Sequence, residues 1–417
     1  MRLATLAWKN LCVEWRRALN VGSFIFFAGF FMALFTCFIG SVKTNMETAV
    51  INALAGEVRL QPAGMEKEDL FSLSGSWEEI NYLTEAEMER AEKALRERIN
   101  PVEVVKRVRH NVLFISDTKE VGGMILGIDP KAVSYRKALT LTAGRYLEND
   151  YEVILTETQA KNLEVQVGDT LGVLAQTKEG YTVDSALTVV GIGSVDLLNL
   201  FGYNVAYTDL RSAQELLGLT EREATDVIIY TGDKKRALET KQQLAAYFSE
   251  NGLPGPTPAL TTWEQTGGFI MGGINFLSIL FYYFTAVLLF IISILLINII
   301  SMTVLERRRE NGTLRAIGFG RMKVAWLFLQ EIQLLVGFFG LLGIVAGSGV
   351  VLSLGRKPIE FGLPISYLTG RHFVFHYDPV RVFAVFCILY GVTMVVAFFP
   401  VYRATKVQPV ELLKEEK

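Results

Sequence analysis

Residues that could carry out acid–base, nucleophilic or metal chemistry are few in this sequence. Of three histidines, His110 stands alone, and no serine–histidine–aspartate motif accompanies it. His372 and His376 are four apart, but the residues between them alternate as in a strand, which does not bring both onto one helical face. No G-x-x-x-x-G-K-[ST] loop is present to hold nucleotide phosphates. We therefore expect no catalytic residues, no metal and no cofactor in this chain, which is not expected to be an enzyme.

Composition points instead to a membrane protein. Of the 417 residues, 51% are hydrophobic and 11% aromatic, more than a soluble chain of this length usually carries. Charged residues make up only 20% and the formal net charge is −2, so no concentrated basic face is available for nucleic acid. The three cysteines lie in or beside apolar segments, and we expect no disulfides.

Four charge-poor apolar runs are long enough to cross a bilayer, which requires about 20 residues of helix. We expect transmembrane helices over 21–42, 274–304, 324–354 and 379–402. Lys and Arg crowd the residues before the first run, the short link 305–323 and the tail 403–417. By the positive-inside rule these segments, the interfacial helix 1–20 and both termini are cytoplasmic, while 43–270 and the loop 355–378 lie outside.

The large outer segment mixes strand-like and helix-like patterns, so we expect an α/β domain inserted between spans one and two. Thr84 and Glu87 form a capping box that predicts a helix to about Arg98. The stretch 176–180 reads as a hairpin tip, with Gly180 at a positive φ. The predicted strands are 57–61, 104–115, 122–128, 153–156, 170–175, 186–192 and 226–230.

The first two spans should continue outward as stalks. Residues 41–55 extend the first apolar run at helical spacing, and the second run is about twice the length that a bilayer requires. Paired glycines at 267–268 and 272–273 predict the boundary between outer domain and helix. Such stalks would link the membrane mechanically to the outer domain.

Several segments together resemble a known family. The link from Glu306 to Gly318 resembles the cytoplasmic coupling segment of FtsX-like and macrolide-exporter-type ABC transporter permeases, and the tail 403–413 resembles their C-terminus. Residues 167–171 and 189–192 are similar to the periplasmic core of that family. Residues 206–217 are most similar to the lipoprotein-releasing, Lol-type permeases. The resemblance covers nearly the whole chain and includes the order of one span, a large outer domain and three spans.

The resemblance implies a function and a set of partners. The chain is expected to be a permease subunit in the cell inner (cytoplasmic) membrane, clamped to two copies of a separate ABC ATPase that binds ATP and Mg. A second permease half, identical or homologous, would complete the transporter. The expected cargo is lipoprotein extracted from the outer leaflet, with membrane lipid around it and a soluble periplasmic carrier as a further partner. Two alternatives stay open: a macrolide-exporter-like efflux permease working with an adaptor, and a signalling permease that activates a cell-wall hydrolase.

The coupling segment is the first candidate site. A short amphipathic helix with apolar residues among arginines can seat in a groove of an ATPase while its charges pair at the rim. An ordinary positively charged loop is the alternative interpretation. The residues assigned to coupling are Glu306, Arg307, Arg309, Glu310, Gly312, Leu314, Arg315, Ala316 and Gly318.

Two apolar groups are further candidates. Phe27, Phe31, Phe35 and Phe38 share one helical stripe of span one and could line a cavity for acyl chains, although lipid-facing or packing roles would give the same pattern. A cluster after one predicted strand could contact cargo or carrier, or belong to the core. Its candidate residues are Leu198, Phe201 and Tyr203.

Overall fold

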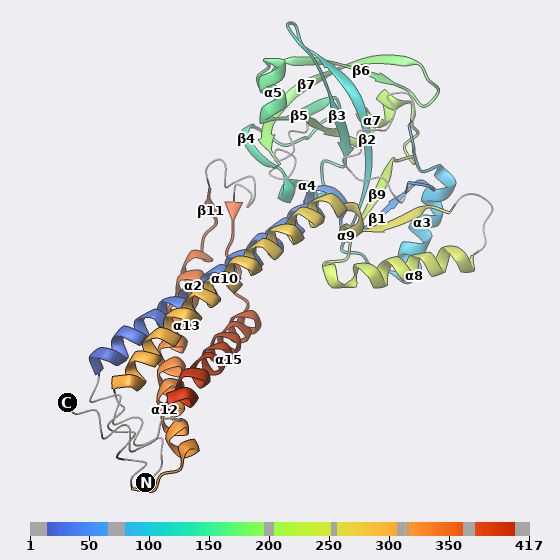
Figure 1. Ribbon diagram of the computed structural model, residues 1–417. Helices are drawn as coiled ribbons and strands as arrows, with labels where there is room; N and C mark the ends of the chain where they lie inside the picture. Colours follow the sequence, from blue (N-terminus) through green and yellow to red (C-terminus); the bar gives the residue numbers. More distant parts are fainter. Residues whose placement is uncertain are drawn as a thin grey trace. The chain divides into compact units, whose positions relative to one another are not determined.

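The computed structural model describes residues 15–65, 80–195, 204–251, 257–306, 313, 317–361 and 372–404. The chain divides into two compact units (Figure 1). The membrane unit consists of residues 1–44, 275–359 and 372–417, and the outer unit of residues 45–274 and 360–371. Two long helices, α2 (Trp15–Val50) and α10 (Gly268–Glu306), run from one unit into the other.

Four helices of the described residues are long and apolar enough to cross a membrane, over Ala18–Ala55, Ile270–Met302, Arg321–Leu354 and Pro379–Arg403. The four-helix architecture with an outer domain after the first span is confirmed. The third span is made of α12 (Arg321–Leu335), the π-helix η3 (Val336–Gly340) and α13 (Leu341–Leu354). The fourth is α15 (Pro379–Ala404), and β11 (Ile359–Glu360) pairs with β12 (His372–Phe373) between them.

Glycines bring the third span close to the first. A Cβ atom at Gly343 would lie 2.1 Å from the carbonyl oxygen of Phe26, and one at Gly347 would lie 2.7 Å from that of Phe30. On the facing helix, a Cβ at Gly29 would lie 2.8 Å from the carbonyl oxygen of Gly340. Small residues spaced four apart allow such backbone contact between membrane helices. This contact fixes α13 against α2.

The outer unit is built on one mixed sheet, in the order β10-β1-β9-β2-β3-β8-β5-β7-β4, with β6 pairing β2 and β7 (Figure 1). Most neighbours are antiparallel, but β3–β8 and β5–β7 are parallel. The strands are β1 (Val58–Gln61), β2 (Glu103–Ile115), β3 (Glu120–Ile128), β4 (Thr140–Gly144), β5 (Glu152–Thr156), β6 (Thr170–Gln176), β7 (Thr182–Ser194), β8 (Val205–Asp209), β9 (Asp226–Tyr230) and β10 (Ala259–Thr262).

Helices cover this sheet. They are α3 (Glu85–Arg98), α4 (Val133–Ala138), α5 (Glu157–Leu163), α7 (Leu210–Leu217), η2 (Lys234–Arg236), α8 (Ala237–Glu250) and α9 (Trp263–Thr266). The capping box of α3 is confirmed, because Thr84 Oγ1 accepts from the backbone N–H of Glu87 and the Glu87 carboxylate accepts from that of Thr84. The hairpin tip is confirmed too, with Gly180 at φ 87°.

The glycine boundary is only partly as expected. The α9 helix ends at Thr266 and α10 begins at Gly268, so the first glycine pair does mark the boundary. The second pair, Gly272 and Gly273, lies inside α10 and just before Ile274, where the outer unit ends. A Cβ at either would meet no atom within 4 Å, so these two glycines are helical residues in open surroundings.

Candidate functional site

An apolar groove lies between the first and second spans, within the membrane unit. Its volume is about 650 Å³, a size typical of small-molecule sites. Thr285 is the one polar lining residue, and its Oγ1 donates to the carbonyl oxygen of Phe281 at 3.0 Å. The lining residues are Met32 and Phe35 of α2 with Phe281, Phe284, Thr285, Val287, Leu288, Ile291 and Ile292 of α10. Such a groove can hold alkyl chains and has no group for acid–base chemistry.

The four phenylalanines predicted to line a lipid cavity lie in two different environments. Phe27, Phe31 and Phe35 are 55%, 43% and 38% exposed, and neighbouring rings in this series lie 6.4 and 6.5 Å apart. Phe38 instead packs among the rings of Phe281, Phe373 and Phe375, at centroid distances of 6.0, 5.6 and 6.1 Å. Of the four predicted lipid-cavity residues, Phe35 is the one that lines the groove.

The α10 wall of the groove was missed in the sequence. Phe281, Phe284, Leu288 and Ile291 follow the spacing of one helical face, which is the signal that was available. The run is apolar on every side, however, so its composition does not single out this face. The position of α2 beside α10 is what distinguishes the face that lines the groove.

The predicted coupling residues fall almost wholly outside the described residues. Glu306 is the last residue of α10, and Gly318 has φ 97°, two residues before the N-cap of α12. The others, Arg307, Arg309, Glu310, Gly312, Leu314, Arg315 and Ala316, lie outside the described residues. The same holds for the cargo-contact candidates Leu198, Phe201 and Tyr203. Both assignments therefore stay predictions.

The outer unit holds the outer ends of both stalks in one core. The π-helix η1 (Ile51–Ala55) continues α2 directly into β1, and α9 joins β10 to α10. Lys234 Nζ lies 2.5 Å from the carboxylate of Glu47 on α2, and the indole N–H of Trp263 donates to the Lys234 carbonyl oxygen at 3.3 Å. Met46, Val50, Ile270 and Ile274 belong to the same hydrophobic cluster. Displacement of either stalk end would therefore strain the domain.

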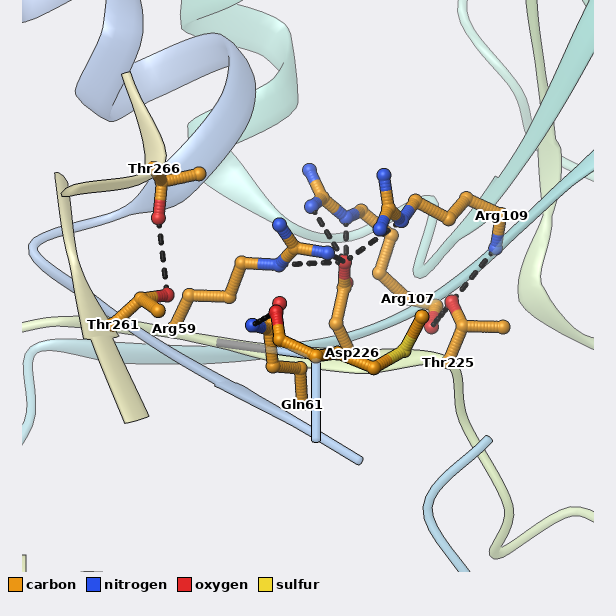
Figure 2. A network of polar contacts seen from close by, with 9 residues as sticks. Arg59, Gln61, Arg107, Arg109, Thr225, Asp226, Thr261 and Thr266 are labelled. Atoms are coloured by element: carbon orange, nitrogen blue, oxygen red, sulfur yellow. Dashed lines mark hydrogen bonds and ion pairs between the residues drawn. The ribbon is translucent and has the colours of Figure 1, made fainter. Parts of the chain in front are cut away.

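A buried ionic network lies where β1, β2 and β9 meet (Figure 2). Asp226 accepts from Arg59 Nε at 3.0 Å and from Arg107 Nε and Nη2 at 2.8 Å each. Arg109 Nε lies 3.4 Å from the same carboxylate. The side chains of Arg59 and Asp226 are 1% and 0% exposed. Three guanidinium groups thus meet one carboxylate inside the domain.

The charges of this network stabilise one another against burial. Burial opposes the ionised form of Asp226, but the charges of Arg107 and Arg59 outweigh it and hold its pKa well below the usual range. Burial and the nearby Arg109 lower the pKa of Arg59 to about 9, so it is still protonated at neutral pH. The network ties the strand that follows the first stalk to β9, and β1 also pairs β10, which precedes the second stalk. The network therefore fixes β1, β2 and β9 relative to one another.

Two family models match this chain. The MacB-like periplasmic core domain matches residues 25–247, more than half of the chain, and the FtsX-like permease C-terminal matches residues 282–409. The chain belongs to the MacB- and FtsX-like family of ABC transporter permeases. Membership and the four candidate spans indicate a multi-pass membrane protein, and the chain spans about 65% of the length of one relative, from Methanocaldococcus jannaschii.

Relatives are similar at low identity. An uncharacterized ABC transporter permease of Methanocaldococcus jannaschii is 24% identical over 66% of this chain and 65% of its own length. The uncharacterized ABC transporter permease YvrN of Bacillus subtilis is 30% identical over 28% of this chain and 26% of its own. The lipoprotein-releasing system transmembrane protein LolC of Neisseria meningitidis is 22% identical over 73% of this chain and 76% of its own.

Two solved structures resemble the outer unit. The extracellular domain of the noncanonic ABC-type transporter YknZ from Gram-positive bacteria is 12% identical, with a TM-score of 0.34, covering 49% of this chain and 98% of that one. The periplasmic region of MacB from Actinobacillus actinomycetemcomitans is 13% identical, with a TM-score of 0.35, covering 53% of this chain and 95% of that one.

Proposed function

We propose that this permease extracts lipidated protein from the outer leaflet of the inner membrane. The observation that carries the proposal is the groove between α2 and α10, whose lining is apolar except for Thr285. A second permease half, identical or homologous, and two copies of a separate ATPase that binds ATP and Mg complete the machine. Both termini are cytoplasmic, and a soluble periplasmic carrier receives the cargo.

The energetics explain why such a groove suits this cargo. An acyl chain that moves from the bilayer into an apolar groove stays in an apolar environment, so entry needs little energy. Moving the same chain into water costs about 0.8 kcal/mol per CH₂, or roughly 10 kcal/mol for a chain of common length. ATP hydrolysis and transfer to a carrier must supply this second step. The groove therefore acts as a holding site between membrane and carrier.

The coupling segment and the two stalk helices transmit the motion of the ATPases to the outer unit. The coupling segment 305–323 seats in the ATPase, and closure of the ATPases displaces the cytoplasmic ends of α2 and α10. The anchoring of both stalk ends in the outer unit supports transmission along these helices, because Glu47, Lys234 and Trp263 connect them through short polar contacts. Narrowing of the groove would then drive the acyl chains outward.

Site-specific crosslinking tests the proposal. Photoreactive residues replace Phe35 and Phe284, one on each wall of the groove. The matched control is Val395 of α15, which is 75% exposed in the membrane unit and does not line the groove. In membranes that contain the ATPase, Phe35 and Phe284 should capture lipidated protein and Val395 should not.

The outcome also separates the alternatives. Equal capture at all three positions would show passive contact with membrane lipoprotein and would contradict a groove site. No capture at Phe35 or Phe284, with ATP hydrolysis intact, would contradict lipoprotein extraction and favour efflux of another cargo or signalling. The companion variant Phe35→Ala removes the packing of one ring without adding polarity, and it should lower cargo-stimulated hydrolysis while basal hydrolysis remains.

A further inference from the structure

Basic residues gather at the outer end of the membrane helices, where segments of this orientation normally carry few. Arg356 and Lys357 follow directly after the end of α13, and Arg381 lies in the first turn of α15. Lys43 ends the charge-free run of the first span. The acidic residues of these same described segments are Asp378 and Glu360. Positive charge is therefore in excess.

Backbone contacts bring these segments to one place. The backbone N–H of His376 donates to Ser41 Oγ on α2 at 2.8 Å. The end of α13 touches the same segment, because a Cβ at Gly355 would lie 2.6 Å from the carbonyl oxygen of Phe375. Spans three and four thus end around the residues that precede α15, and α2 passes beside them at Ser41.

Arg381 lies at the centre of this junction. A Cβ at Gly40 would lie 2.5 Å from Arg381 Nη1, so the guanidinium occupies the space that the missing side chain leaves on α2. Its Nε lies 3.0 Å from the Asp378 carboxylate, which also caps the first backbone N–H groups of α15. Arg381 remains 46% exposed. Asp378 and the contact with Gly40 therefore position the Arg381 guanidinium, while nearly half of the Arg381 side chain stays exposed.

The position matches that of lipid headgroups. The third apolar span ends at Leu354 and the fourth begins at Pro379. Tyr377 is 38% exposed beside them, and aromatic residues are common at a membrane interface. Guanidinium and ammonium groups at this depth pair readily with phosphate. We propose that Arg356, Lys357 and Arg381 bind the phosphate of an anionic phospholipid of the outer leaflet. The site differs from the groove, and the inference does not depend on which cargo is moved.

Native mass spectrometry of the full-length protein in mild detergent tests this site. Phosphatidylglycerol or phosphatidylcholine is added, and retained lipid is counted for each. The triple variant Arg356→Gln, Lys357→Gln, Arg381→Gln should lose the preference for phosphatidylglycerol, by about fivefold in affinity for each charge removed. The matched control removes three exposed lysines of the outer unit, as Lys131→Gln, Lys137→Gln, Lys161→Gln, and should retain the preference.

Three other outcomes would each overturn the assignment of a phospholipid site to these residues. An unchanged preference in the triple variant means that the lipid binds elsewhere, and an equal loss in the control means that only net charge matters. Displacement of the lipid by millimolar inorganic phosphate would indicate a soluble anion site instead. If the triple variant does not fold, the double variant Arg356→Gln, Lys357→Gln replaces it, since both residues are exposed and lie beyond α13; it should lose about 25-fold.

Discussion

Replacing Asp226 by asparagine should destabilise the outer unit strongly. The substitution keeps the shape of the side chain but removes the one carboxylate that Arg59, Arg107 and Arg109 share. Loss of one partner of a buried ion pair costs about 3 to 5 kcal/mol, because the remaining charge is buried without compensation. For a domain of this size that corresponds to a decrease of about 10 °C in the unfolding temperature.

Thermal unfolding of the full-length protein in detergent measures the effect, with hydrogen exchange of peptides from β1 and β9 locating it. Asp150→Asn is the matched control, because Asp150 pairs with Arg211 at 3.4 Å while both side chains are at least half exposed. Exposed pairs contribute at most about 1 kcal/mol, so this control should shift the transition by less than about 4 °C. If both variants shift it equally, the network is not the tie between β1 and β9 that its geometry indicates.

Three further outcomes are expected. Charge reversal at Arg309 and Arg315 should reduce recovery of the ATPase with the purified permease and leave membrane insertion intact; full recovery would remove the coupling assignment. A cysteine at Lys178 should react with an impermeant thiol reagent in spheroplasts and one at Asn311 should not, and the reverse pattern would invert the topology. Hydrogen bonds from Arg145 lower the pKa of Glu152 to about 2, so its contribution to stability is present above the unfolded pKa of about 4.3 and is lost as the pH falls towards 2. Glu152→Gln should therefore flatten the acid unfolding curve in that window, and an unchanged curve would refute the role of this pair.

The spans and most strands were predictable because their signals are local. Apolar length identifies a membrane helix, and β6 (Thr170–Gln176) alternates between buried and more exposed residues along its whole length. The strands β4, β8 and β10 were missed. β8 (Val205–Asp209) and β10 (Ala259–Thr262) are fully buried and do not alternate, but the same holds for β5, which was predicted. The missed strands differ because they lack the consecutive Val, Ile and Leu residues of β5 and β9. In β4 (Thr140–Gly144) no residue is buried, so this strand shows no alternation between buried and exposed residues.

The sites were less predictable, because they depend on which elements meet. Arg107 and Arg109 alternate on β2 and so share a face, but only the register with β9 places Asp226 beside them. Phe35 was found because phenylalanines are conspicuous in the first span. Its partner Phe284 lies in a helix that is apolar on all sides, where no pattern marks one face.

The contact between α13 and α2 yields a last prediction, which tests whether the first and third spans move as one body. Gly343→Ala would place a Cβ 2.1 Å from the Phe26 carbonyl oxygen, and because that atom is backbone, the helices must separate. Overpacking of this kind costs about 1 to 3 kcal/mol. Gly349→Ala is the control on the same helix, with no atom within 4 Å of its Cβ. Cysteines introduced on facing turns of α2 and α13 should crosslink more slowly in the Gly343 variant than in the control, with lower thermal stability in detergent. Equal crosslinking and stability in the two variants would mean that the two spans are not held by this close contact, and that a displacement of α2 need not carry α13 with it.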